Sequence, residues 1–340
     1  MATQGHGHIE RRPAAILAAT MRRREFVGLL AALAAWPRAV AAEEKIYRIG
    51  VLSGLRRPSE PVLLKALEAR GYVEGRNAFI LSRNAEGEPS RLPALAAELI
   101  GLKPDVIIAA GGPAAEALKA TTATIPIVLW GVGDPVGLGL IANVAHPGSN
   151  ITGVTELSTE LTPKRLQLLK ETVPNAKRIA ILWNATDRSM DLRAQEAVHV
   201  APTLGITMVP LPLHDVDEID TTLAALAKDP PDAVMVVTDP MTLRKQRTTL
   251  EFLASHGLAS MYEFPGNARA GALLSYGPDF ADIAPVAADY VDRILKGARP
   301  GALPVESPTR YYLLVNRKTA AQLGISVPTG ILIRADEVIE

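Results

Sequence analysis

Five apolar stretches of the sequence end in glycine, hydroxyl, amide or carboxylate residues of the kinds that bind small molecules. These ends are Ser53-Gly54, Gly111-Gly112, Gly133-Asp134, Trp183-Asn184 and Thr238-Asp239. In open parallel sheets, ligands bind beyond the carboxyl ends of the strands, where the N–H groups of the next helix favour anions. A glycine pair lets the backbone approach a carboxylate or phosphate closely, and an aspartate can pair with a ligand cation. The five ends are therefore the first candidates for a ligand site.

The same residues also have structural interpretations. Gly111-Gly112 can serve a tight turn between a strand and a helix. Asp134 and Asp239 each precede a proline and can cap the helix that follows. Because the two acids occupy equivalent places in two halves of the chain, we expect at least one of them to contact a ligand.

Patterns for covalent catalysis and nucleotide binding are absent from the sequence, and the only metal-like pattern is the weak tract Gly5-His6-Gly7-His8 near the N-terminus. The chain has no cysteine, which excludes a disulfide scaffold, a thiol enzyme and a cysteine-ligated metal. Neither G-x-S-x-G nor H-E-x-x-H occurs, and the glycine pair does not extend to G-x-G-x-x-G. The 36 basic and 36 acidic side chains argue against a nucleic-acid binder. We expect no catalytic residue, no metal, no cofactor and no nucleic-acid partner.

Strand and helix patterns alternate along the chain from residue 46. Apolar runs predict strands over 46–53, 78–82, 105–110, 125–130, 178–183, 207–211, 233–238 and 259–264. Most are followed by a helical pattern, as over 61–71, 90–102, 162–171, 189–204 and 216–228. Short runs without alternation indicate buried parallel strands in a βα series. The fold class is therefore α/β, with two Rossmann-like lobes that have parallel sheets.

Three passages of the chain between the lobes are expected to form a hinge. The first lies near 153–157, and extended runs at 273–277 and 311–316 are interpreted as the other two. Lobe 1 would comprise 44–155 plus 278–310, and lobe 2 would comprise 156–277 plus 311–340. Several crossings between two α/β lobes make a hinge, and a hinge makes a cleft that closes.

The N-terminal region, 1–41, has the pattern of an extension followed by an export signal. Arg22-Arg23-Arg24 precedes the uncharged run 26–35, and Ala39-Val40-Ala41 provides a small-residue cleavage site. A basic head, a short apolar middle and an A-x-A end are typical of a secretory signal. Arg23 to Val27 also resembles the twin-arginine motif, so both export routes stay open. We expect cleavage near Ala41 and a periplasmic protein; an ordinary amphipathic helix is the alternative.

Segments throughout the mature chain resemble bacterial ABC-transporter substrate-binding proteins of the tryptophan-binding-like family. They are RIGVLS (48–53), RGYVEGRN (70–77), RLPALAAEL (91–99), IPIV (125–128), DPVG (134–137), HPGSNITG (146–153), KRLQLLK (164–170), GALLSYG (271–277) and RADEVIE (334–340). The resemblance implies a type I periplasmic-binding-protein fold, with two lobes joined by a three-segment hinge. It also implies a protein that is not an enzyme, captures a small solute between the lobes and delivers it to an ABC permease in the inner membrane. Some relatives bind aromatic amino acids.

Carried over residue by residue, the resemblance implies a set of cleft-lining positions. They are Ser53, Gly111, Gly112, Asp134, Asp239, Ser275 and Tyr276, and the loop at Asn184 also reaches the cleft. In amino-acid binders of this fold, backbone and hydroxyl donors hold the carboxylate and an acid holds the ammonium; Asp239 is our choice for that acid. Many relatives have proline after the asparagine, whereas Asn184 is followed by Ala185, so the solute stays open.

Two other functions fit the same architecture. One is an α/β enzyme acting in the cleft between the lobes. The other is a ligand-sensing regulator, which the export signal disfavours. We expect a monomeric solute receptor.

Overall fold

The computed structural model describes residues 45–56 and 59–340. The predicted extension and export signal, 1–41, lie outside the described residues. Within those residues, no helix has both the length and the apolar character needed to span a membrane.

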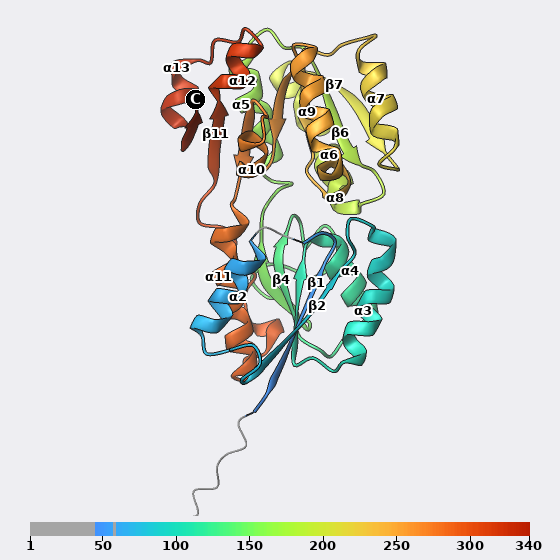
Figure 1. Ribbon diagram of the computed structural model, residues 1–340, viewed down its shortest axis with the longest axis vertical. Coiled ribbons are helices and arrows are strands. Elements are labelled where there is room, and N and C mark those ends of the chain that lie inside the picture. Colours follow the sequence, from blue (N-terminus) through green and yellow to red (C-terminus); the bar gives the residue numbers. More distant parts are fainter. Residues whose placement is uncertain (1–44, 57–58) are drawn as a thin grey trace, which may run out of the picture. The chain divides into compact units, whose positions relative to one another are not determined.

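Lobe 1 contains a five-stranded parallel sheet with the order β2-β1-β3-β4-β5 (Figure 1). Its strands are β1 (Tyr47–Ser53), β2 (Ala78–Asn84), β3 (Val106–Ala110), β4 (Ile127–Val132) and β5 (Ile151–Thr155). Its helices are α2 (Glu60–Ala69), α3 (Leu92–Gly101), α4 (Gly112–Thr121) and α11 (Phe280–Leu295), with short 3₁₀ turns η1 (Pro89–Arg91) and η3 (Pro300–Ala302).

Helices cover both faces of this sheet, which explains why its strands are continuous apolar runs. Ile49 and Val51 pack in the core under α2 and α11, whereas Leu52 packs in the core under α3 and α4. Because successive side chains of a strand point to opposite faces, a strand buried on both faces must be apolar at every position. The predicted parallel α/β sheet is confirmed.

Lobe 2 contains a seven-stranded sheet with the order β12-β11-β10-β9-β8-β6-β7. Its strands are β6 (Arg178–Asn184), β7 (Thr207–Leu213), β8 (Ala233–Val236), β9 (Ala259–Tyr262), β10 (Leu274–Gly277), β11 (Tyr312–Asn316) and β12 (Glu337–Ile339). Its helices are α5 (Thr162–Thr172), α6 (Arg188–Val200), α7 (Glu218–Leu226), α8 (Pro240–Arg244), α9 (Gln246–Ser255), α10 (Pro265–Arg269), α12 (Arg317–Gln322) and α13 (Thr329–Arg334), with the 3₁₀ turn η2 (Ala201–Leu204). The part β7-β6-β8-β9-β10 is parallel and repeats the order of lobe 1.

The chain passes three times between the sheets. The passages are 156–161 after β5, 278–279 after β10, and 307–311 before β11. The stretches 273–277 and 311–316, predicted as crossings, are instead largely strands β10 and β11 of lobe 2, paired antiparallel. Their β-rich pattern predicts two strands but not which strands they pair with. The crossings between the lobes lie just outside these two strands.

Candidate functional site

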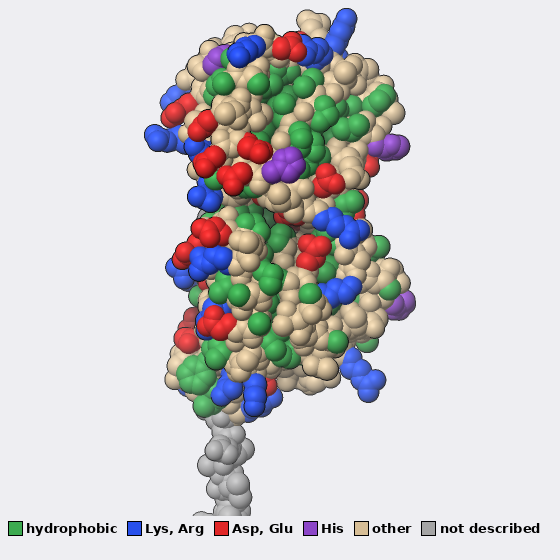
Figure 2. Space-filling model, turned by 90° about the vertical axis from the view of Figure 1, so that its right-hand side faces the viewer, with side chains coloured by type: hydrophobic (Ala, Val, Ile, Leu, Met, Phe, Trp, Pro, Cys, Tyr) green, Lys and Arg blue, Asp and Glu red, His purple; other side chains and the backbone are tan. Residues whose placement is uncertain are grey.

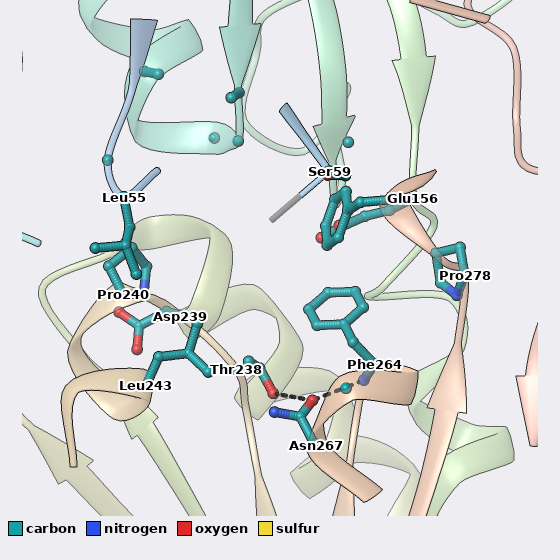
Figure 3. A pocket seen from close by; sticks show the side chains of 18 of the residues that line it. Leu55, Ser59, Glu156, Thr238, Asp239, Pro240, Leu243, Phe264, Asn267 and Pro278 are labelled. Atoms are coloured by element: carbon teal, nitrogen blue, oxygen red, sulfur yellow. Dashed lines mark hydrogen bonds between the residues drawn. The ribbon is translucent and has the colours of Figure 1, made fainter. Parts of the chain in front are cut away.

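A cavity of about 580 Å³ lies between the lobes, at the carboxyl ends of both sheets. Figure 3 shows side chains from both lobes facing this space. Small-molecule sites are typically about 300–1,000 Å³, so the cavity has the size of a ligand site. Its lining combines apolar side chains such as Leu55, Met190 and Leu243 with a few charged ones.

The lobe 1 wall contains the N-terminus of α4. Gly111 and Gly112 both line the cavity, and Gly111 has a φ of 95°, which favours glycine. The first N–H groups of a helix have no acceptor within the helix and carry the positive end of its dipole. This wall can therefore bind an anionic group such as a carboxylate.

The lobe 2 wall contains Asp239, which has two functions in the structure. Its Oδ1 accepts a hydrogen bond from the Thr242 N–H at 2.8 Å and so caps α8. Its Oδ2 accepts a hydrogen bond from Nδ2 of Asn184 at 2.8 Å. Asp239 also lines the cavity, so capping the helix and facing a ligand are compatible.

A second carboxylate of lobe 2, Asp187, lines the cavity and was not among the candidates from the sequence. Its Oδ1 accepts from the Ser189 N–H at 2.8 Å and caps α6. Burial, and then the charge of Asp239, raise the pKa of the Asp187 carboxyl to about 6. An aspartate just before a helical pattern was the available sequence signal.

A buried network of ion pairs lies beside the cavity and joins the hinge to lobe 2. Arg193 of α6 contacts Glu156 at 2.5 Å and Glu263 at 2.9 Å. Arg165 of α5 contacts Glu263 at 3.1 Å and donates to the Tyr276 carbonyl at 2.8 Å. Two arginines therefore balance two glutamates in charge away from water. Among the described residues, Oε2 of Glu156, Nε of Arg193 and Nη2 of Arg165 have no hydrogen-bond partner.

Both Glu156 and Arg193 line the cavity, although neither was singled out in the sequence. Glu156 lies in the first passage between the lobes, directly after β5, and Arg193 lies in the middle of α6. No local motif marks either residue, because their partners are distant in sequence.

Two phenylalanines, one from each lobe, meet in the lining of the cavity. The ring centroids of Phe264, before α10, and Phe280, at the start of α11, are 4.8 Å apart with planes at 52°. Aromatic rings at this separation attract one another and offer an apolar surface to a further ring.

Three of the eight residues proposed from the sequence line the cavity: Gly111, Gly112 and Asp239. Asn184 does not line the cavity, but its Nδ2 donates a hydrogen bond to Oδ2 of Asp239. The other four are placed as follows. Ser53 is buried and its hydroxyl accepts a hydrogen bond from Nδ2 of Asn84 at 3.0 Å. The Asp134 carboxylate accepts from the Gly137 N–H at 2.7 Å. Ser275 is buried, and the ring of half-buried Tyr276 has its centroid 6.3 Å from that of Tyr311.

The lobes also touch each other next to the cavity. A Cβ on Gly112 would lie 3.1 Å from Cβ of Ser189, across the cleft. Nη2 of Arg188 donates to the Gly137 carbonyl of lobe 1 at 3.1 Å. These contacts join the two lobes beside the cavity, and Figure 2 shows one face of the molecule with the two lobes above and below a narrower middle.

Comparison with known families identifies the protein class. The model of the family described as ABC transporter substrate binding protein matches residues 60–339. The chain belongs to this family. Members are solute-binding proteins, which bind small molecules and work with ABC transporter permeases.

Three relatives illustrate the similarity. A curated protein named tyrosine-binding protein, from Clostridioides difficile (strain R20291), is 25% identical over 285 residues, covering 82% of this chain and 81% of its own. A structure of a conserved domain protein from Vibrio cholerae has a TM-score of 0.82 and 29% identity, covering 86% of this chain and 100% of that one. The ABC domain from Streptococcus pneumoniae in complex with L-Trp has a TM-score of 0.79 and 25% identity, covering 87% and 100%. The fold is that of the type I periplasmic binding proteins.

Proposed function

We propose that this substrate-binding protein captures an amino acid with an aromatic side chain in the cavity between its lobes. The observation that carries the proposal is the arrangement of three features in one cavity. They are the N-terminus of α4 in lobe 1, the carboxylates Asp239 and Asp187 in lobe 2, and the Phe264–Phe280 pair.

Each feature matches one part of a zwitterionic aromatic amino acid. The carboxylate is held by the free N–H groups of α4. The ammonium is held by Asp239, with Asp187 next to it. The side chain lies against the phenylalanine rings and apolar residues such as Leu243. The relatives named for tyrosine and solved with L-Trp support the same ligand class.

Closure of the lobes follows from this mode of binding. A ligand that touches α4 in lobe 1 and Asp239 in lobe 2 binds the closed state more tightly than the open state. Only such a difference in affinity shifts the equilibrium between the two states. The permease can then distinguish the loaded protein by its closed shape.

We also propose that the protein is exported and acts in the periplasm as a monomer, with its signal cleaved near Ala41. The basic head, apolar run and A-x-A site of the N-terminal region support this. Because family members are solute-binding proteins, we expect no turnover of the bound molecule and no role for nucleic acid.

A thermal-shift screen tests the ligand class. A ligand that binds only the folded protein raises its melting temperature. We expect L-tyrosine and L-tryptophan to raise it, and their N-acetyl derivatives, which carry no ammonium, to have no effect. A sugar, nucleobase or aliphatic acid that stabilises the protein while the aromatic amino acids do not would overturn the proposal.

A further inference from the structure

One carboxylate oxygen at the edge of the cavity has no hydrogen-bond partner within the described part of the chain. It is Oε2 of Glu156, in a residue that is only 3% exposed. The hydroxyl of Ser59, which also lines the cavity, is likewise buried and unpartnered among these residues. Leaving a buried carboxylate oxygen unpaired is unfavourable, so it favours a ligand that donates a hydrogen bond.

The position of Glu156 is fixed from both lobes. Its N–H donates to the Val132 carbonyl of β4 at 3.1 Å. Nη2 of Arg193 donates a hydrogen bond to Oε1 of Glu156, and Nη1 of Arg193 donates to Oε2 of Glu263 at 2.9 Å. Only Oε1 of Glu156 contacts the guanidinium, and both Oε2 of Glu156 and Nε of Arg193 have no hydrogen-bond partner among the described residues.

The charge of Glu156 is already balanced by Arg193, whereas Asp187 and Asp239 have no arginine of their own in the ion-pair network. The ammonium of a ligand is therefore best placed at the aspartates. A neutral O–H or N–H donor is the group that suits Glu156. Figure 3 shows Glu156 and Asp239 on opposite sides of the cavity, with Phe264 on the side of Glu156.

We propose that Glu156 is a specificity-determining residue that accepts a hydrogen bond from an O–H or N–H group on the side chain of the bound amino acid. The proposal rests on the proposed function. Glu156 would therefore favour binding of tyrosine and tryptophan, which carry such a donor, over phenylalanine, which has the shape of tyrosine but lacks the hydroxyl. Glu156 also links ligand to hinge, because one carboxylate contacts the solute and α6 while its backbone is bonded to β4.

The first test compares ligands on the unaltered protein by calorimetric titration. Tyrosine and phenylalanine differ only by the phenolic hydroxyl. We expect tyrosine to bind about tenfold or more tightly, as for a hydrogen bond to a charged group. Equal affinities for the two would overturn this inference and leave the proposed function intact. If no aromatic amino acid binds, the proposed function itself fails.

The second test uses Glu156→Gln. The N–H of Arg193 requires the amide oxygen to face it, so the amide NH₂ faces the cavity. Tryptophan can only donate from its ring N–H and is expected to lose about tenfold or more in affinity, while phenylalanine stays within about twofold. Equal losses for tryptophan and phenylalanine would contradict the assignment.

Glu263→Gln is the matched control. Glu263 belongs to the same buried network but does not line the cavity. We expect it to lower the melting temperature and leave the tryptophan-to-phenylalanine affinity ratio unchanged. A change of that ratio as large as in Glu156→Gln would assign the effect to the network and overturn the direct contact. If Glu156→Gln does not fold, the comparison of tyrosine with phenylalanine on the unaltered protein alone decides whether the inference stands.

Discussion

Gly133 of lobe 1 lies against the guanidinium of Arg193 in lobe 2, with no space for a side chain between them. A Cβ on Gly133 would lie 2.5 Å from Nη2 of Arg193. The guanidinium cannot easily withdraw, because Glu156 and Glu263 both hold it. This contact between the lobes therefore requires glycine directly after β4.

Replacing Gly133 with alanine should oppose closure. The added methyl group must displace the paired guanidinium or keep the lobes apart, so we expect the affinity for L-tyrosine to fall about tenfold or more. Calorimetric titration measures this loss. Gly101→Ala, where an added Cβ meets nothing within 4 Å, is the control and should bind normally. Unchanged affinity in Gly133→Ala would show that closure does not depend on this contact.

The change Asp239→Asn tests the ammonium contact. Asparagine can still accept from the Thr242 N–H, so the cap on α8 is retained, whereas the hydrogen bond from Nδ2 of Asn184 is lost because the new NH₂ group is also a donor. The charge-assisted bond to the ligand is lost, and binding of L-tyrosine should weaken by roughly 1–3 kcal/mol. A tyrosine analogue without its amino group should bind the variant as well as it binds the unaltered protein. An unchanged dissociation constant for L-tyrosine would remove Asp239 from the site.

Asp187 should make both stability and binding depend on pH. Its folded pKa of about 6 lies above the ordinary value of 3.8, so the folded state holds the proton more tightly than the unfolded state. Its contribution to stability is therefore fully present below about pH 4 and is lost as the pH rises through 6. Asp187→Asn keeps a capping side chain and should raise the free energy of unfolding at pH 7.5 by ~1–3 kcal/mol, with a smaller gain at pH 4.5.

Ligand binding provides the companion measurement. An ammonium near Asp187 favours its ionised form, so the affinity for L-tyrosine should increase from pH 5 to pH 7 in the unaltered protein. In Asp187→Asn the affinity should vary less over this range. A variant that is destabilised equally at pH 4.5 and 7.5, with an unaltered pH profile of binding, would contradict this interpretation.

Hydrophobic pattern was enough to predict most strands of the two sheets, but it did not predict β5 and β12. The runs that became β1, β3, β6 and β8 are apolar at nearly every position because helices cover both faces. The short helices α10, α12 and α13 were missed, since five or six residues are too few to show a helical period. The antiparallel pairing of β10 with β11 depends on contacts distant in sequence.

From the sequence, residues of the site could be predicted only where they follow the end of a predicted strand. Gly111 and Gly112 come immediately after β3 and Asp239 lies three residues after β8, and all three line the cavity. Glu156 and Arg193 carry no such mark; their importance comes from a buried ion pair between residues 37 apart in sequence. A sequence pattern cannot reveal a partner that only the fold brings close.

The most direct test of the central claim is a crystal structure of the protein grown with L-tyrosine. We predict the amino acid between the lobes, with its carboxylate at the N-terminus of α4, its ammonium at Asp239 and its hydroxyl at Glu156. A tyrosine bound to one lobe only, or outside this cavity, would contradict the account.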